Sequence, residues 1–348
     1  MTSLPIDRPS IRGTALALTL AAAVATVPDP TLAATSGSSD ERLERALAHL
    51  VDAFPGRAGV AVRHVDSGVG AGIDAGTPYP MASTYKVSIL VEMMARIEAG
   101  DLSLDAEIEL QPSDQHIGSG LLQDLSAPGL TLSLRNLSTM MIILSDNSAT
   151  DMIIDRLGAE AITARMRSLG YDNIRVDRTT LELIVDYLGV PYEGLEEADR
   201  AEIEVVLAQL DFDSAAARDA AEAFYGDGLD KASAAEMNDL LVRIARGEIV
   251  SAEASKTIVE ILKKTRTGAN RLRGLLPSGI TLAHKTGTIG RVVNDVGIIS
   301  LPDDLGRFAI SVFTLADDGV DIATNERLIA DLARTSYDFF LFQQRTSH

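Results

Sequence analysis

Strand-like stretches near the two ends of the chain enclose a long helical middle, and this order restricts the fold more than any other feature. Residues 58–65 and a segment ending at Asp74 are predicted to form a hairpin around Asp66-Ser67-Gly68. Further strands are predicted at residues 279–283, 295–301 and 308–315, and helices at 39–54 and 325–344. The order predicts an α+β protein in which one antiparallel sheet is built from both chain ends.

The predicted lobes divide a single domain at residues 35–348 of the 348-residue chain, which is long enough for a sizeable core. The sheet lobe is expected at about residues 40–80 and 266–348. The helical lobe is expected at about residues 81–265, inserted between the two parts of the sheet lobe.

A Ser-x-x-Lys motif, Ser83-Thr84-Tyr85-Lys86, opens a long apolar segment that runs to Ile97 and ends at Gly100. The segment is apolar almost all round, which predicts a buried helix. A serine in the first turn faces free backbone N–H groups, and a lysine one turn later lies on the same face, within reach of the serine proton. The pair can serve as nucleophile and base. Alone it is weak evidence, because such a motif is expected roughly once by chance in a chain of this length.

Two further motifs raise the specificity of this signal. Ser145-Asp146-Asn147 ends a predicted buried helix at residues 132–145, and Lys285-Thr286-Gly287-Thr288 lies beside a predicted strand. At average composition each triplet is expected by chance in roughly one chain in ten or fewer. The three motifs in this order therefore indicate one active site.

The three motifs make the chain resemble the class A serine β-lactamases and the related penicillin-binding proteins, whose signature they are. Three more stretches extend the resemblance over most of the chain: Arg271-Leu272-Arg273-Gly274-Leu275-Leu276-Pro277, Asn294-Asp295-Val296 and Gly118-Ser119-Gly120-Leu121-Leu122. The resemblance implies a β-lactamase/transpeptidase-like fold. It also implies a secreted serine hydrolase that is acylated at Ser83 and hydrolyses the amide bond of β-lactams.

The resemblance also implies a role for each motif residue. Ser83 attacks a carbonyl, Lys86 accepts or relays its proton, and Ser145 passes a proton to the leaving nitrogen. The backbone N–H groups of Ser83 and Thr288 form an oxyanion hole. The remaining site residues bind substrate: Asn147 holds its amide side chain, Lys285, Thr286 and Thr288 hold its carboxylate, and Arg271 reinforces that carboxylate site. For Arg271 an ordinary surface arginine is an equal alternative.

One departure from the class A pattern concerns release of the acyl group. In class A enzymes a glutamate in the loop after Ser-Asp-Asn activates the deacylating water. Thr180 stands at that position here, and Ile184 replaces a following asparagine. Arg178 remains, and Asp230 is the candidate acid that pairs with it to close the loop. Glu182 is the nearest carboxylate, and we interpret it as a structural or solvent-facing acid rather than a base.

The missing glutamate keeps a second class of function open: a D-Ala-D-Ala peptidase, an esterase, an amidase or a slowly deacylating penicillin-binding protein on the same scaffold. A third possibility is a non-catalytic binding module. It is suggested by an acidic insertion at about residues 185–230, in a region where only Arg200 and Arg218 are basic. We interpret the insertion as amphipathic helices with a solvated acidic face rather than as an ion-binding site.

Charge and composition limit the classes of molecule that the protein is expected to bind. A net charge of −19 argues against nucleic-acid binding, which needs a basic footprint. The chain has no cysteine, and its five histidines show no metal-ligand spacing, so neither a metal nor a cofactor is expected. The expected partner is a small β-lactam or peptide-like substrate with a carboxylate, bound by a monomer.

Residues 1–34 are typical of a secretory signal peptide. Arg8 and Arg12 precede an apolar run at residues 15–27, and small residues follow at Ala33 and Ala34. The run is too short to span a bilayer, although an uncleaved anchor is the alternative. We therefore expect a periplasmic or secreted protein with no stable membrane span after signal cleavage.

Overall fold

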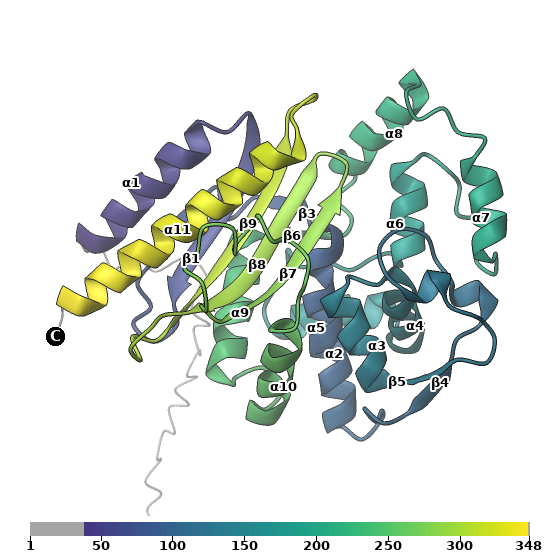
Figure 1. Ribbon diagram of the computed structural model, residues 1–348, viewed down its shortest axis with the longest axis horizontal. Helices are drawn as coiled ribbons and strands as arrows, with labels where there is room; N and C mark the ends of the chain where they lie inside the picture. The colour runs from purple at the N-terminus through teal and green to yellow at the C-terminus, as the bar shows by residue number, and fades with distance from the viewer. Residues whose placement is uncertain (1–37, 347–348) are drawn as a thin grey trace, which may run out of the picture. The chain divides into compact units, whose positions relative to one another are not determined.

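A five-stranded antiparallel sheet forms the centre of the computed structural model, which describes residues 38–346 (Figure 1). The predicted signal peptide lies outside the described residues. The strand order is β2-β1-β9-β8-β7. The strands are β1 (Gly56–His64), β2 (Gly70–Ile73), β7 (Leu282–Ile289), β8 (Val292–Ser300) and β9 (Arg307–Ala316). Val60 of β1 lies opposite Val312 of β9, so a strand from the N-terminal part of the chain pairs with one from the C-terminal part at the middle of the sheet. This confirms the predicted α+β fold.

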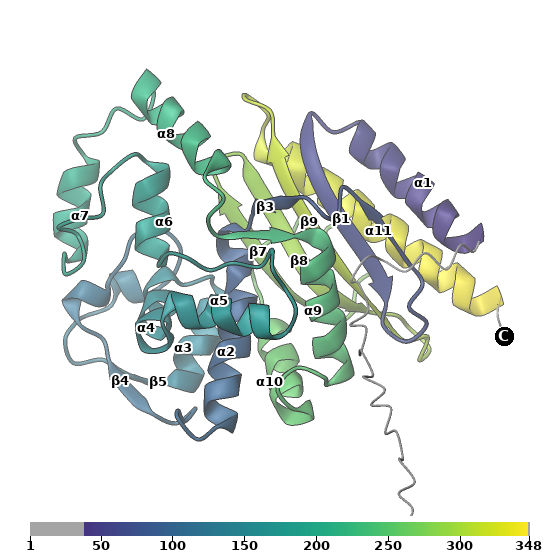
Figure 2. The ribbon, with the colours of Figure 1, turned by 180° about the vertical axis from the view of Figure 1, so that it is seen from behind.

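Different helices cover the two faces of the sheet (Figures 1 and 2). α1 (Ser38–Asp52) and α11 (Ile322–Thr346) lie side by side on one face, and α9 (Ala234–Arg246) and α10 (Ala252–Leu262) lie on the other. Side chains alternate between the two layers along β1: Val60 and Val62 join the core under α1 and α11, whereas Ala61 joins the core of the helical lobe. The sheet is therefore buried on both faces.

α2 (Lys86–Glu98) lies inside the helical lobe and is buried from Lys86 to Ala95, as its all-round apolar sequence predicted. A 3-10 turn, η1 (Ala82–Tyr85), precedes it and carries Ser83. The other elements of this region are α3 (Leu134–Ile143), α4 (Asn147–Leu157), α5 (Ala159–Ser168), the strand pairs β3 (Pro78–Pro80) with β6 (Lys231–Ser233) and β4 (Glu107–Glu109) with β5 (Thr131–Ser133), and the turns η2 (Pro112–Asp114) and η3 (Leu122–Asp124). No helix between residues 38 and 346 has both the length and the apolar character that crossing a membrane requires.

β7 differs from the prediction, which ended a strand at Ala283 and left the Lys-Thr-Gly motif beside it. The strand begins at Leu282 and includes the whole motif up to Ile289. Gly287 obscured this, since glycine weakens a strand pattern. The structure gives the reason for the glycine: a Cβ at Gly287 would lie 2.5 Å from the Met81 carbonyl oxygen. The motif therefore lies on an edge strand pressed against η1.

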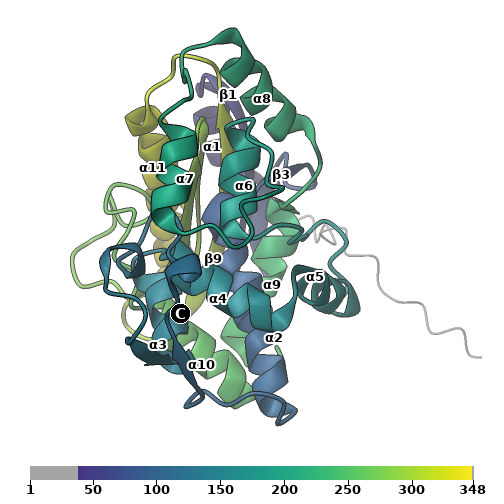
Figure 3. The same ribbon diagram turned by 90° about the vertical axis from the view of Figure 1, so that its right-hand side faces the viewer.

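The acidic segment folds into three helices, α6 (Thr180–Tyr187), α7 (Arg200–Leu207) and α8 (Ala215–Gly226), which Figure 3 shows together. They have a small core of their own, formed by Leu181, Val185, Leu195, Ala198 and Ile203. Ile117, from the loop between η2 and η3, packs against this core. Arg200 on α7 also donates to the Gln123 carbonyl at 2.8 Å. The segment is thus a folded unit anchored to the 117–124 loop.

Candidate active site

The three sequence motifs meet at the junction of η1, α2, the α3–α4 loop and β7. The Ser145 hydroxyl lies between two lysines, with its Oγ 3.3 Å from Lys86 Nζ and 2.9 Å from Lys285 Nζ. Both lysines are completely buried, and Lys86 also donates to the Ser145 carbonyl at 2.8 Å. Ser83 is only partly buried, and within the described residues its hydroxyl makes no hydrogen bond. The site thus combines an unengaged serine hydroxyl, three residues before Lys86, with two buried amines that share the Ser145 hydroxyl.

The Ser-Asp-Asn turn is fixed by its middle residue. Asp146 caps α4 by accepting from the Ala149 N–H at 2.9 Å. It also accepts from the N–H groups of Leu121 and Leu122, at 2.6 and 3.0 Å. A Cβ at Gly120 would lie 2.4 Å from Asp146 Cγ, so this loop needs its glycine. The turn leaves Ser145 in the left-handed region at φ 59°, which directs its side chain between the lysines.

The backbone around Ser83 is held against the sheet. Asn294 of β8 donates through Nδ2 to the carbonyls of Pro80 and Met81, at 2.9 and 3.0 Å. A Cβ at Gly287 would also lie 3.0 Å from the Ser83 backbone nitrogen, so this N–H borders the edge of β7. Ala82, just before the serine, has φ 44°, a costly conformation for a residue with a side chain. The serine backbone is therefore rigidly positioned.

Burial controls the charge of both lysines. It lowers the pKa of Lys86 to about 7, although Asp151 and Asp146 oppose the shift. Burial also lowers the pKa of Lys285 well below its usual range, and the nearby charge of Lys86 lowers it further. Two ammonium groups that share one hydroxyl repel each other. A neutral amine is therefore available in the site near neutral pH.

Asn147 and Thr286, two of the predicted substrate-binding residues, already make contacts within the protein. Asn147 accepts from Lys86 Nζ at 3.1 Å and donates to the Ile117 carbonyl at 2.9 Å. The Thr286 hydroxyl lies 2.6 Å from that of Thr267. Asn147 therefore ties Lys86 to the 117–124 loop, and Thr286 ties β7 to the segment beyond α10.

Arg271 is buried, with 7% of its surface exposed, so the surface alternative does not apply. Its guanidinium donates to the exposed Thr288 hydroxyl at 2.7 Å and to the Gly287 and Asn294 carbonyls at 3.0 Å each. Glu326 of α11 balances its charge at 3.1 Å. Arg271 thus lies directly behind Thr288.

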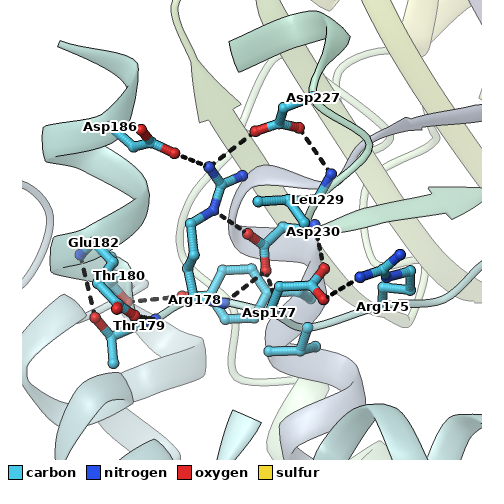
Figure 4. Close-up of polar contacts among 12 residues, drawn as sticks. Arg175, Asp177, Arg178, Thr179, Thr180, Glu182, Asp186, Asp227, Leu229 and Asp230 are labelled. Carbon is cyan, nitrogen blue, oxygen red and sulfur yellow. Dashed lines mark hydrogen bonds and ion pairs between the residues drawn. The ribbon is translucent and has the colours of Figure 1, made fainter. Parts of the chain in front are cut away.

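A hydroxyl pair occupies the place where the sequence lacks a glutamate. Thr180 begins α6, and its hydroxyl lies 2.8 Å from that of Tyr85, which is 1% exposed. The Glu182 carboxylate is engaged elsewhere: it accepts from the Thr179 N–H at 2.7 Å in a capping box (Figure 4). This is the structural role expected for Glu182.

The sequence interpretation missed Tyr85, Asp151 and His116. Asp151 accepts from the N–H groups of Thr180 and Leu181, at 2.6 and 3.0 Å, and lies 2.6 Å from His116 Nδ1. The available signal was spacing. Asp151 follows Asn147 by four residues, which in a helix puts a second polar side chain on the face that carries the motif. Asp151 thereby holds the start of α6 against α4.

Arg178 joins the two ends of the α6–α8 segment (Figure 4). Its Nε lies 2.6 Å from Asp230, which confirms the predicted pair, and its Nη1 lies 2.9 Å from Asp227 and also contacts Asp186. The Phe224 ring lies beneath the guanidinium at 4.9 Å. One buried arginine therefore closes the loop with three carboxylates, two more than expected.

The fold and the clustered serine and lysines define the class as a serine hydrolase, and comparisons with known proteins identify the family. A model of the beta-lactamase enzyme family matches residues 42–340. Beta-lactamase VEB-1 of Pseudomonas aeruginosa is 24% identical over 322 residues, with 88% of this chain and 93% of the relative covered. Extended-spectrum beta-lactamase PER-1, also of Pseudomonas aeruginosa, is 25% identical over 272 residues, with 76% of each covered. The chain belongs to the beta-lactamase enzyme family.

Solved structures show the same fold. The TLA-3 extended-spectrum beta-lactamase superposes with a TM-score of 0.71 at 22% identity, over 87% of this chain and 99% of that one. A PBP-A variant solved as an acyl-enzyme complex with penicillin G gives a TM-score of 0.67 at 24% identity, over 86% of this chain and 96% of that one. The β-lactamase/transpeptidase-like fold implied by the motifs is thereby confirmed.

Proposed function

We propose that the protein is acylated at Ser83 by β-lactams and hydrolyses their amide bond. The observation that carries this proposal is the Ser145 hydroxyl held between the buried amines of Lys86 and Lys285, with Ser83 and its unengaged hydroxyl three residues before Lys86. The family relatives are named as beta-lactamases, which supports the substrate class.

In the acylation step, Ser83 Oγ attacks the lactam carbonyl while its proton passes to neutral Lys86. The developing oxyanion is stabilised by the backbone N–H groups of Ser83 and Thr288, a term that is often the largest in acyl transfer. The C–N bond then breaks, and Ser145 delivers a proton to the ring nitrogen. Because the opened ring stays attached, the acyl-enzyme carries the whole mass of the β-lactam.

The substrate carboxylate determines which of the two lysines is charged. Its carboxylate binds Lys285, Thr286 and Thr288, with Arg271 behind Thr288 reinforcing the positive potential. A bound anion favours the charged form of Lys285, which in turn favours the neutral form of Lys86 through their repulsion. Asn147 holds the amide side chain of the substrate through the second N–H of its amide group.

A second candidate function rests on the Thr180–Tyr85 hydroxyl pair, which replaces a carboxylate at the deacylation position. Neither hydroxyl is a base near neutral pH, and burial raises the pKa of Tyr85 well above its usual range. A lactam ester on Ser83 would then persist, as in a penicillin-binding protein. The natural reaction would be that of a D-Ala-D-Ala peptidase, an esterase or an amidase.

Mass spectrometry after mixing with penicillin and with nitrocefin tests both functions. An adduct of the full β-lactam mass on Ser83, absent from Ser83→Ala, is expected. Steady nitrocefin turnover supports the β-lactamase, whereas a stable adduct supports the slowly deacylating alternative. Absence of both an adduct and turnover with several β-lactams would reject both. A Ser83→Ala protein with full biological activity would point to a binding module instead.

The remaining expectations concern the whole protein. We propose one catalytic domain at residues 35–348 with the two lobes given above, exported by the segment at residues 1–34 and active in the periplasm or outside the cell as a monomer. Fractionation of expressing cells followed by N-terminal sequencing tests export and cleavage, and light scattering tests the monomer.

A further inference from the structure

A basic hollow lies beyond the C-terminal end of α10, where α3 also ends. Its volume is about 710 Å³, and half of its lining residues are cationic: Lys263, Lys264, Arg266 and Arg273. The described residues that line it include no Asp or Glu. This is unexpected in a chain whose net charge is −19.

The hollow lies beside the Lys-Thr-Gly strand. The Thr265 hydroxyl donates to the His284 carbonyl at 2.5 Å, and the Thr267 hydroxyl lies 2.6 Å from that of Thr286. Both threonines line the hollow, and their two partners flank Lys285 in β7. The basic segment therefore runs along the same stretch of strand that presents Lys285.

A second contact ties the hollow to the Ser-Asp-Asn turn. The Arg266 N–H donates to the Ile143 carbonyl at 3.0 Å, and Ile143, the last residue of α3, lines the hollow. Ile143 precedes Ser145 by two residues. The lining of the hollow therefore contacts both neighbours of Lys285 in β7, including Thr286, and reaches to within two residues of Ser145 along the chain.

Only one of the four cations that line the hollow forms an ion pair within residues 38–346, although Lys264 also lies near Glu260. Lys263 is paired with Glu260 at 2.8 Å. Lys264, Arg266 and Arg273 are exposed, and within residues 38–346 none of them forms an ion pair. Lysines suit the negative end of a helix dipole, which accounts for Lys263 and Lys264 after α10. That effect does not account for Arg266 and Arg273, which lie beyond the helix.

We infer that the hollow is an anion subsite that holds a second carboxylate or phosphate of the substrate, next to the carboxylate bound by Lys285. This inference rests on the proposed function and names the preferred substrate class: β-lactams or peptides with two anionic groups on the side of the Lys-Thr-Gly strand. Lys264, Arg266 and Arg273 contribute by charge, and a hollow of about 710 Å³ has room for a substituent of several atoms.

The test compares two cephalosporins that differ only in the substituent next to the ring carboxylate, which ends in a carboxylate in one compound and in its methyl ester in the other. The acylation rate constants of both are measured at low ionic strength. In the triple variant Lys264→Gln/Arg266→Gln/Arg273→Gln, the preference for the dianion should fall by about ten-fold, because several exposed charge pairs are lost together.

A matched control removes the same number of charges elsewhere. Lys256→Gln/Arg327→Gln/Arg334→Gln changes three exposed cations that do not line the hollow, and it should keep the parent preference. Equal preferences in the two triple variants would overturn the inference.

Inorganic phosphate gives a readout that does not depend on acylation. In ¹⁵N-labelled protein it should shift the amide signals of residues 263–267 in the parent and in the control variant, but not in the Lys264/Arg266/Arg273 variant. No shift in the parent overturns the anion subsite. If neither cephalosporin acylates Ser83 although phosphate binds, the proposed function is what fails.

Discussion

Lys86 is the residue on which the chemistry of the site depends, because its contacts and its required charge state compete. Its ammonium donates to the Ser145 carbonyl and to Asn147, which favours the charged form. Complete burial favours the neutral form and prevails, since it lowers the pKa to about 7. Near neutral pH the Lys86 amine is therefore present both as a charged hydrogen-bond donor and as a neutral base.

The rate of acylation should follow this balance. The base must be neutral, so the acylation rate constant should rise with pH and level off above the Lys86 pKa of about 7. Lys86→Met should lower the rate by about 10² to 10⁴-fold, the usual range for loss of a general base. Stopped-flow acylation across pH 5 to 8 measures both effects, with Lys256→Met as an exposed control. A flat pH profile would exclude Lys86 as the base.

Thr180 is expected to limit release of the acyl group. Its hydroxyl lies 2.8 Å from that of Tyr85, which leaves no room for a larger side chain, so Tyr85→Phe is combined with Thr180→Glu. The new carboxylate should shorten the acyl-enzyme lifetime at least about ten-fold, because it can activate water. Lifetimes are followed by mass spectrometry. Tyr85→Phe/Thr180→Gln has the same size without a base, and equal lifetimes in the two variants would contradict the argument.

At the scale of elements, Arg178 determines whether α6–α8 stays closed. Arg178→Ala leaves Asp186, Asp227 and Asp230 without their shared cation. Loss of one partner of a buried pair costs about 3–5 kcal/mol, so amide exchange across residues 180–230 should accelerate while the sheet stays protected. Arg175→Ala removes a more exposed pair with Asp177, worth about 1 kcal/mol at most, and should change little. Similar exchange in both variants would count against Arg178 as the closing residue.

The elements that were predictable from sequence are those whose signal is local. The burial of α2 follows from its all-round apolar sequence, and the sheet follows from short strand-like segments near both ends of the chain. The extent of β7 was not predictable, because Gly287 serves a contact with Met81 that only the fold creates. The three-residue strands, such as β3 with β6, are too short to show a period.

The residues of the site also fall into those that the sequence predicts and those that it does not. Motif residues were predictable because their types and order are specific to one chemistry. The contacts that orient them were not predictable, because the Thr180–Tyr85 contact joins residues 95 apart and the backbone N–H groups that Asp151 accepts from carry no sequence signal. The two extra carboxylates on Arg178 were hidden among the many acids of the same segment.

At the scale of the whole molecule, residues 190–219 of the acidic segment can be deleted without removing any residue of the two large cores. None of residues 190–219 belongs to those cores. A Cβ at Gly189 would lie 2.8 Å from the Ala220 Cβ, so two glycines can bridge the cut. The remaining protein should fold and keep its acylation chemistry, as circular dichroism and adduct formation can verify.

The same deletion should alter how salt affects substrate capture. Because the segment carries much of the net charge of −19, it repels an anionic β-lactam at long range. The deletion variant should acylate faster than the parent at low salt, and the difference should vanish near 1 M salt, where charges are screened beyond about 3 Å. An uncharged β-lactam ester should show no such difference. Equal rates for the anionic compound at low salt would argue against steering by the segment.

The pairing of β1 with β9 has a consequence for how the protein is made. Val60 meets Val312 only after about 250 further residues have been synthesised. At roughly 5–20 residues per second, the first hairpin waits about ten seconds or longer for its central partner. Pairings this distant in sequence also make folding slow. During that interval the edge of β1 is open to other chains, so the nascent protein needs a chaperone more than the finished one does.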